Sequence, residues 1–264
     1  MNGIFSLAGR RALVTGANTG IGRAIALGLA GQGADVVLHH LGDHAGAEAA
    51  RAEIAGLGRK VSVIEADFAD RSAVGALAAA ALRGGPVDIL IANAAIEMRS
   101  AWTALGEDSL DAQVAVNFTS LIALAQAFVP AMQARGWGRV VATNSVMASR
   151  PRAETLVYAS LKSAQLTTIR AIAREVACDG VTMNVIAPGA IETEANAARY
   201  ADPEFLRAVV AKIPAGRQGR PEDCVGPVLM LCSAAGAYVT GASIPVDGGW
   251  TIGDATGALP GEAA

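Results

Sequence analysis

Aromatic residues are scarce in this sequence, where Phe, Trp and Tyr make up 4% of 264 residues. Aliphatic side chains and alanine must therefore fill most of the core. The chain also lacks an excess of positive charge, because 21 Lys and Arg against 24 Asp and Glu give a net charge of −3. This balance, without any run of Lys and Arg, excludes a general electrostatic attraction to nucleic acid or to anionic lipid.

Cysteine is rare, and Cys178, Cys224 and Cys232 lack the CxxC spacing that is typical of metal sites. We expect three small buried residues in a reducing compartment and no metal site. The first residues lack a basic segment followed by a long apolar stretch, which argues against a secretory signal. We also expect no segment long and apolar enough to cross a bilayer. These absences together predict a cytoplasmic protein that binds neither nucleic acid nor membrane.

Short apolar segments alternate with longer helical patterns along the chain. Strands are predicted at 11–16, 35–40, 60–67, 87–95, 138–145, 181–189 and 241–249, and helices at 20–33, 45–58, 71–85, 109–134, 156–178 and 221–233. The strands are apolar in runs, as expected when helices cover both faces of a sheet. The pattern predicts an α/β fold, with a single Rossmann-type doubly wound parallel sheet and helices on both faces. We expect one dinucleotide-binding and catalytic domain over 1–250 and a small polar tail over 251–264.

A glycine-rich stretch, "TGANTGIG", follows the first predicted strand directly. Gly16, Gly20 and Gly22 stand where this strand turns into a helix, and glycine lets a backbone approach a ligand closely. The helix then offers free N–H groups and the positive end of its dipole to a phosphate. The alternative is a merely tight turn. The position of the glycines in an alternating α/β pattern favours a pyrophosphate site.

A tyrosine and a lysine stand four residues apart in "YASLK", at Tyr158 and Lys162. Residues at this spacing share one face of a helix, and the pair alone would also suit a half-buried ring beside a solvated amine. Ser145 precedes the tyrosine by thirteen residues, and Asn117 lies in the long preceding helical pattern. Each of these residues alone has an ordinary structural explanation, but together, behind a phosphate loop, they favour catalysis.

With the spacing GxxxGxG, the segment "YASLK" and a serine at a strand end, residues 7–250 resemble the short-chain dehydrogenase/reductase family. The resemblance implies an oxidoreductase that transfers a hydride between NAD(P)(H) and an alcohol or carbonyl. Tyr158 is then the acid/base and Lys162 its partner. Ser145 donates to the substrate oxygen, and Asn117 holds a water that links the lysine to bulk solvent. A positive lysine and an oxidised nicotinamide are expected to lower the tyrosine pKa from its usual value near ~10.

The same resemblance implies the residues that contact the cofactor. They are Gly16, Asn18, Thr19, Gly20, Ile21, Gly22, His40, Asp67, Phe68, Asn93, Ala94, Tyr158, Lys162, Pro188, Gly189, Ile191 and Thr193. One departure is "IANAA", where Ala92 and Ala95 replace an asparagine and a glycine of the family's NNAG stretch. This change leaves Asn93 in place and concerns the geometry of a turn more than the chemistry.

The cofactor preference depends on the end of the second strand, where NAD-preferring enzymes place an acid on the ribose hydroxyls. Here His40 stands at that position, and no arginine stands where a 2′-phosphate would be bound. His39 and His40 would donate to that phosphate, although solvated loop histidines would look the same. The sequence slightly favours NADP and leaves NAD as an alternative.

Substrate contacts are expected from the segments that follow three of the strands. The candidates are Glu97, Arg99, Ser145, Arg152, Glu154, Tyr158 and Glu192. Charged groups favour a small polar substrate, such as a sugar, a polyol or a hydroxy acid, over an apolar one, although rim charges in water would give the same pattern. Residues 190–215 are expected to form a loop that acts as a lid.

Two other functions remain open from the sequence. The first is a carbonyl reductase of the 3-oxoacyl carrier-protein type, which belongs to the same family. The second is a catalytically idle dinucleotide-binding sensor, which the presence of Ser145, Tyr158 and Lys162 opposes. The resemblance also implies a homotetramer or homodimer. Its expected interface is the alanine-rich helical patterns near 109–134 and 156–178.

Overall fold

The computed structural model describes residues 3–252, in which seven parallel strands form one sheet. The strands are β1 (Arg11–Val14), β2 (Asp35–His40), β3 (Val61–Glu65), β4 (Ile89–Ala92), β5 (Gly138–Thr143), β6 (Val181–Pro188) and β7 (Ser243–Val246). Their order is β3-β2-β1-β4-β5-β6-β7, so the direction of the crossovers reverses between β1 and β4. Ligands of such sheets bind outside the carboxyl ends of the strands at this reversal. The predicted fold class is confirmed.

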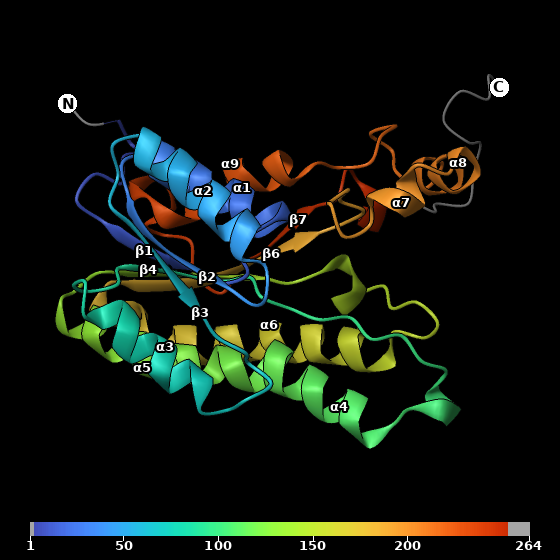
Figure 1. Ribbon diagram of the computed structural model, residues 1–264, viewed down its shortest axis with the longest axis horizontal. Coiled ribbons are helices and arrows are strands. Elements are labelled where there is room, and N and C mark those ends of the chain that lie inside the picture. Colours follow the sequence, from blue (N-terminus) through green and yellow to red (C-terminus); the bar gives the residue numbers. More distant parts are fainter. Residues whose placement is uncertain (1–2, 253–264) are drawn as a thin grey trace.

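Helices cover both faces of the sheet, as Figure 1 shows. On one face lie α1 (Gly20–Gly31), α2 (His44–Gly56) and α9 (Val225–Cys232). On the other lie α3 (Ala73–Leu82), α5 (Ser120–Ala134) and α6 (Leu156–Val176). Each layer buries its own apolar cluster against the sheet, because successive strand residues point to opposite faces. Leu13 belongs to the cluster under α5 and α6, and its neighbour Val14 to the cluster under α1.

The long helix before β5 differs from the prediction in two ways. It consists of α4 (Glu107–Val114), a π-helical turn (Ala115–Thr119) and α5. Together these make 28 residues with a mean hydropathy of 1.6 in the most apolar window, which is enough by length and composition to cross a membrane. The expectation that no segment meets this test was wrong. Half of that window is buried inside the protein, and core helices commonly pass the same test.

The segment between β6 and β7 also departs from the prediction. A loop was expected over 190–215, but the structure contains α7 (Ala197–Tyr200) and α8 (Pro203–Val210). Asp202 caps α8 by accepting a hydrogen bond from the backbone of Glu204, and Pro203 begins the helix, a favourable arrangement for a helix start. Figure 1 shows α7 and α8 at one end of the molecule, beyond β6.

Two smaller expectations concern the cysteines and the tail. Cys224 and Cys232 are buried, whereas Cys178 is exposed near the end of α6, so the expectation of three buried cysteines was wrong for one of them. The predicted tail over 251–264 lies outside the described residues except for its first two positions.

Candidate active site

The glycine-rich turn after β1 forms a tight cradle before α1. Gly16 and Gly20 adopt positive φ angles of 62° and 53°, which other residues reach only with strain. A Cβ at Gly22 would lie 2.0 Å from the carbonyl oxygen of Gly16. Thr19 precedes α1 in an extended conformation and its side chain makes no cap bond. Thr19 therefore leaves the first N–H groups of α1 uncapped. An anion site at the start of a helix requires such uncapped N–H groups.

Asn93 fixes this turn from the neighbouring strand. Its Nδ2 donates to the carbonyl oxygens of Thr15 at 2.9 Å and Gly16 at 3.0 Å. In return, Thr15 Oγ1 accepts hydrogen bonds from the backbone N–H groups of Asn93 and Ala94, both at 2.9 Å. The two alanines that depart from the family pattern therefore leave these contacts intact.

Replacing Gly22 by alanine tests whether the cradle binds a dinucleotide. The new Cβ would displace the backbone of Gly16 and the amide of Asn93, which would lie 2.5 Å away. We expect ADP-ribose to bind at least about tenfold more weakly, a loss of about 1.4 kcal/mol. Calorimetric titration measures the change. Gly31→Ala is the matched control, because a Cβ at that end of α1 meets nothing within 4 Å. Equal affinity in both variants would contradict the assignment.

His39 supports the turn and does not serve the cofactor phosphate as expected. Its Nδ1 accepts from the backbone N–H of Gly16 at 3.1 Å, and its Nε2 lies 2.9 Å from the carbonyl oxygen of Ala66. The ring stacks on Phe68 with centroids 4.3 Å apart. Burial lowers the pKa of His39 to about 4, so the ring is neutral at pH 7. The buried Phe68 packs against His39, and its expected contact with the cofactor stays a prediction.

His40 and the residues around it lie at the end of β2. His40 is 2% exposed, its Nδ1 has no hydrogen-bond partner among residues 3–252, and its ring meets His44 edge to face. His40, His44 and Glu65 bring potential ligand atoms within 4.8 Å of one another. His44 Nε2 lies 3.6 Å from Glu65 Oε2, and both of these side chains are exposed. Nearby, Asn18 Nδ2 donates to Asp43 Oδ2 at 3.0 Å.

A cleft of about 430 Å³ opens at the carboxyl ends of β4, β5 and β6. It brings together the predicted residues Ile21, Asn93, Glu97, Arg99, Ser145, Arg152, Tyr158, Lys162, Pro188, Gly189, Ile191 and Thr193. It is also lined by residues that the sequence reasoning missed, among them Asn144, Met147, Asn196, Arg199, Tyr200, Phe205, Val209 and Trp250. Several of these belong to α7 and α8, which had been expected to be a loop. The sequence could have indicated Asn144 as a cleft residue, because it directly precedes Ser145 at a strand end.

Tyr158 is half-buried in the first turn of α6, beside Ser145. Burial raises the pKa of Tyr158 to about 12, and the negative charge of Glu97 acts in the same direction. A hydrogen bond with Ser145 opposes this shift. The lowered pKa was expected with the oxidised nicotinamide bound, and in the protein without its cofactor the shift is upward. Desolvation of the phenolate outweighs the neighbouring donor.

Lys162 lies one turn further along α6 and is 1% exposed. Its Nζ donates to the carbonyl oxygen of Thr143 at 2.7 Å and lies 5.3 Å from the centroid of the Tyr158 ring. Burial lowers the pKa of Lys162 to about 7. Burial therefore weakens the positive charge that was expected beside the tyrosine in the protein alone. Asn144 Nδ2 holds the same turn by donating to the Lys162 carbonyl oxygen at 2.6 Å.

Asn117 lies in the π-helical turn, a feature often found at functional sites. Its Oδ1 accepts from the backbone N–H of Ile96 at 2.9 Å, and its Nδ2 donates to the Ile96 carbonyl oxygen at 2.8 Å. Its own carbonyl oxygen accepts from Gln165. Asn117 thereby fixes the loop that carries Glu97. The expected role in holding a water stays a prediction.

Two arginines pair with one carboxylate at the mouth of the cleft, and a third arginine lines the same cleft. Glu97 contacts Arg99 at 2.7 Å and Arg152 at 3.3 Å. Burial lowers the pKa of Arg152, and the charges of Arg99 and Arg199 add to this effect, while Glu97 opposes it. Arg199 stacks over Phe205, with its Cζ 4.6 Å from the ring centroid. Positive charge is therefore in excess here.

Glu154, Glu192 and Asp67 are placed differently from the other candidates. Glu154 has a positive φ of 66° and lines a separate apolar hollow. Glu192 accepts a hydrogen bond from Gln218 at 2.9 Å. The structure does not bring these two carboxylates into the cleft as expected. Asp67 Oδ1 accepts from the backbone of Ala69 at 2.9 Å, so it caps the turn after β3.

The sequence and the fold both have close relatives. A family profile described as "Enoyl-(Acyl carrier protein) reductase" matches residues 16–251. The 2-dehydro-3-deoxy-D-gluconate 5-dehydrogenase of Pseudoalteromonas atlantica is 37% identical over 247 residues, which are 93% of this chain and 97% of that protein.

Two solved structures extend the likeness. A putative NAD(P)-dependent gluconate 5-dehydrogenase from Beutenbergia cavernae, with bound NADP, has a TM-score of 0.89 at 39% identity, covering 95% of this chain and 100% of that one. A 3-oxoacyl (acyl-carrier-protein) reductase from Agrobacterium tumefaciens, with NADP bound, has a TM-score of 0.89 at 40% identity, covering 93% and 95%. The nearly complete coverage, together with the glycine cradle and the Ser–Tyr–Lys cleft, shows that this chain belongs to the short-chain dehydrogenase/reductase family of oxidoreductases.

Proposed function

We propose that this protein transfers a hydride between a nicotinamide dinucleotide, with NADP preferred, and a secondary alcohol or carbonyl of a small sugar acid. The observation that carries the substrate class is the excess of guanidinium groups beside Tyr158. Arginine pairs with carboxylates through two parallel hydrogen bonds, which suits an anionic substrate. The names of the Pseudoalteromonas and Beutenbergia relatives support a sugar acid, and the NADP in two solved structures supports the cofactor.

The balance of charge in the cleft supports an acid over a neutral sugar. Arg99 and Arg152 share the single carboxylate of Glu97, and Arg199 stacks on Phe205. A neutral sugar would leave this positive charge uncompensated. A substrate carboxylate would pair with it in a partly desolvated cleft, where such a pair is stronger than in water.

The residues of the chain then have separate roles. The bound nicotinamide supplies the acceptor or the donor of the hydride. The Tyr158 hydroxyl gives its proton to the substrate oxygen in reduction and takes it back in oxidation, and Ser145 donates to the same oxygen. The pKa of Tyr158, about 12 in the free protein, keeps this proton in place for reduction. For oxidation, a protonated Lys162 and the positive nicotinamide ring favour the tyrosinate.

Substitution of Arg152 by glutamine tests the substrate class. D-gluconate and D-sorbitol are a matched pair, because they differ in the carboxylate at one end of the same carbon chain. We expect kcat/KM for gluconate to fall by about 10- to 100-fold, as for loss of a charge-assisted hydrogen bond. Activity with sorbitol, however low, should change by less than about threefold, since a net change of ~0.6 kcal/mol corresponds to that factor.

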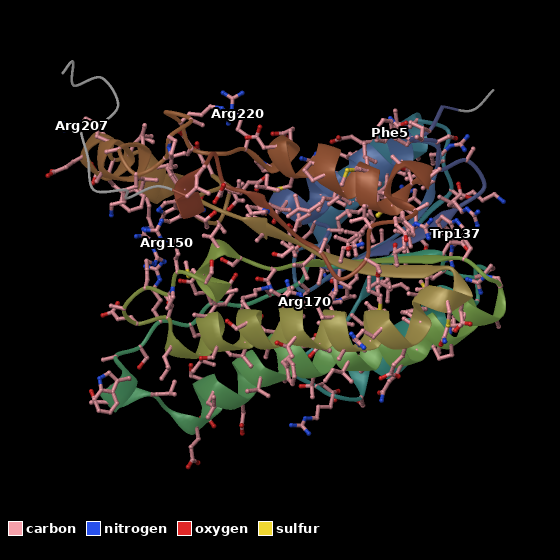
Figure 2. The ribbon with its side chains drawn as sticks, turned by 180° about the vertical axis from the view of Figure 1, so that it is seen from behind. Phe5, Trp137, Arg150, Arg170, Arg207 and Arg220 are labelled. Atoms are coloured by element: carbon pink, nitrogen blue, oxygen red, sulfur yellow. The ribbon has the colours of Figure 1, made fainter. Side chains whose placement is uncertain are left out.

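Arg207→Gln is the matched control for this experiment. Arg207 lies on α8 at the outer end of the molecule (Figure 2), and its Nε donates to the carbonyl oxygen of Pro203 at 3.2 Å. The Arg207→Gln variant should leave kcat/KM unchanged with both gluconate and sorbitol. An equal loss of activity with gluconate and sorbitol in Arg152→Gln would indicate a disturbed cleft and would contradict recognition of the carboxylate.

A second candidate function, reduction of a 3-oxoacyl thioester, is favoured by one observation. An apolar hollow of about 600 Å³ lies beside Arg152 and is lined in part by Pro151, Leu156 and Trp102, which is 76% exposed. An acyl chain would fit such a surface. Oxidation of NADPH by acetoacetyl-CoA measures this activity. A rate well above that with any sugar acid would favour this candidate over the first.

We further propose that the protein acts in the cytoplasm as a homotetramer or homodimer. The family resemblance supports this assembly, and the outward faces of α5 and α6 would form the interface. Both helices lie in the outer layer on one side of the sheet (Figure 1).

A further inference from the structure

A carboxylate from a distant segment reaches the amino end of α1. The backbone N–H of Gly20 donates to Glu194 Oε2 at 3.0 Å, across 174 residues of sequence. The adjacent Thr193 also packs against Gly20. Its Cγ2 lies 3.1 Å from the point where a Cβ at Gly20 would stand. The first turn of α1 contains no acidic residue, and Thr19 makes no side-chain cap. Glu194 therefore supplies the negative charge at this helix end.

This N–H group belongs to the glycine cradle in which a pyrophosphate is expected. The free N–H groups and the dipole of a helix attract any anion, whether carboxylate or phosphate. One backbone N–H cannot serve both at full strength. A carboxylate held beside a pyrophosphate would also repel it. Glu194 and the dinucleotide must therefore compete for the amino end of α1.

The segment that carries Glu194 also forms a wall of the substrate cleft. Thr193 N–H donates to Asn196 Oδ1 at 2.8 Å, and Asn196 Nδ2 donates to the carbonyl oxygen of Ile191 at 2.9 Å. Thr193 and Asn196 line the cleft, as do Arg199 and Tyr200 on α7. A movement of Glu194 away from Gly20 would therefore move residues that face the substrate.

We propose that Glu194 is an internal anion that closes the pyrophosphate site in the free protein and is displaced by the dinucleotide. Its displacement moves the segment that carries Thr193 and Asn196, so binding of the dinucleotide changes the shape of a wall that already lines the substrate cleft. This inference goes beyond the proposed function and does not depend on which alcohol is the substrate. The displaced carboxylate lowers dinucleotide affinity in the unmodified protein, because its contact with Gly20 must break first.

The test is the affinity of Glu194→Ala for ADP-ribose, which carries the pyrophosphate without the nicotinamide. We expect calorimetric titration to give a dissociation constant about tenfold lower than that of the unmodified protein. Glu204→Ala is the control, because it removes one exposed carboxylate from the same segment without touching α1. It should leave the affinity unchanged. Unchanged or weaker binding in Glu194→Ala would overturn the proposal.

Amide hydrogen exchange gives a second readout that is independent of catalysis. In the free proteins, the amides of residues 193–200 should exchange faster in Glu194→Ala, because the contact that ties this segment to α1 is absent. Saturation with ADP-ribose should abolish the difference, since the contact is then absent from both proteins. Equal exchange in the two free proteins would overturn the proposal, as would a difference that persists with ADP-ribose bound.

Discussion

Replacement of Tyr158 by phenylalanine is expected to abolish hydride transfer while dinucleotide binding persists. The change removes only the hydroxyl, because the ring remains on α6 beside Lys162. General acid–base catalysis by one group contributes about 10²- to 10⁴-fold, so we expect kcat to fall by at least about 1,000-fold in both directions. Steady-state rates with NADPH or NADP⁺ measure the loss, and titration with ADP-ribose shows that the cradle is intact.

Tyr238→Phe is the matched control for this variant. Tyr238 is fully exposed near the end of α9, so loss of its hydroxyl should change neither rate nor binding. A Tyr158→Phe variant that retains more than about a hundredth of the original kcat would contradict the acid/base assignment, because an essential proton donor is worth at least about 10²-fold.

Replacement of Lys162 by methionine is expected to abolish activity and yet to stabilise the fold at neutral pH. The pKa of Lys162 falls from 10.5 to about 7 in the folded protein. Between these values the unfolded chain binds a proton that the folded chain does not, so stability of the unmodified protein rises with pH through this window. Below about pH 7 the full penalty for the buried ammonium applies. Methionine, which carries no proton, avoids this penalty.

The size of the gain follows from two opposing effects. The fall in pKa from 10.5 to about 7 corresponds to about 4 kcal/mol at neutral pH. Loss of the hydrogen bond to the Thr143 carbonyl oxygen leaves a buried acceptor, which costs about 1–3 kcal/mol. We expect the free energy of unfolding to increase by about 1–3 kcal/mol at pH 7, and the gain to disappear above about pH 10.

Urea unfolding at pH 7 and pH 10 measures this difference, with Lys60→Met as the control. Lys60 is exposed, so its removal should leave the pH dependence of unfolding unchanged. A Lys162→Met variant less stable than the unmodified protein at pH 7 would show that the buried amine stabilises the fold, contrary to this account. In both outcomes the variant should lack activity, because the charge that favours the tyrosinate is gone.

The regular elements were predictable because apolar residues recur along them in the pattern that each kind of element requires. Strands such as β2 and helices such as α6 bury whole faces, and that burial is visible as hydrophobic pattern. The two short helices α7 and α8 were missed because α7 has only four residues and neither helix has a fully buried residue. The π-helical turn that holds Asn117 was also missed, since its hydrogen-bond register leaves no mark in composition.

The candidate site was predictable in its members and less so in its electrostatics. Ser145, Tyr158 and Lys162 lie together in the cleft, as the spacing of the motifs suggested. Without the cofactor the pKa of Tyr158 is raised by burial, an effect that the sequence does not reveal, and the lowering expected with the oxidised nicotinamide bound stays a prediction. The contact between Gly20 and Glu194 joins segments 174 residues apart, and only the fold brings them together.

The central claim is hydride transfer between NADP(H) and a sugar acid. The most direct test is to incubate the unmodified protein with NADP⁺ and a panel of sugar acids and matched polyols, and to monitor the absorbance of the reduced nicotinamide. The account predicts turnover with at least one sugar acid, preference for that acid over its polyol, and no turnover in Tyr158→Phe. Absence of turnover with every acid and polyol, and with NADPH and acetoacetyl-CoA, would contradict the account if ADP-ribose still bound. The protein would then be a dinucleotide-binding sensor and not an enzyme.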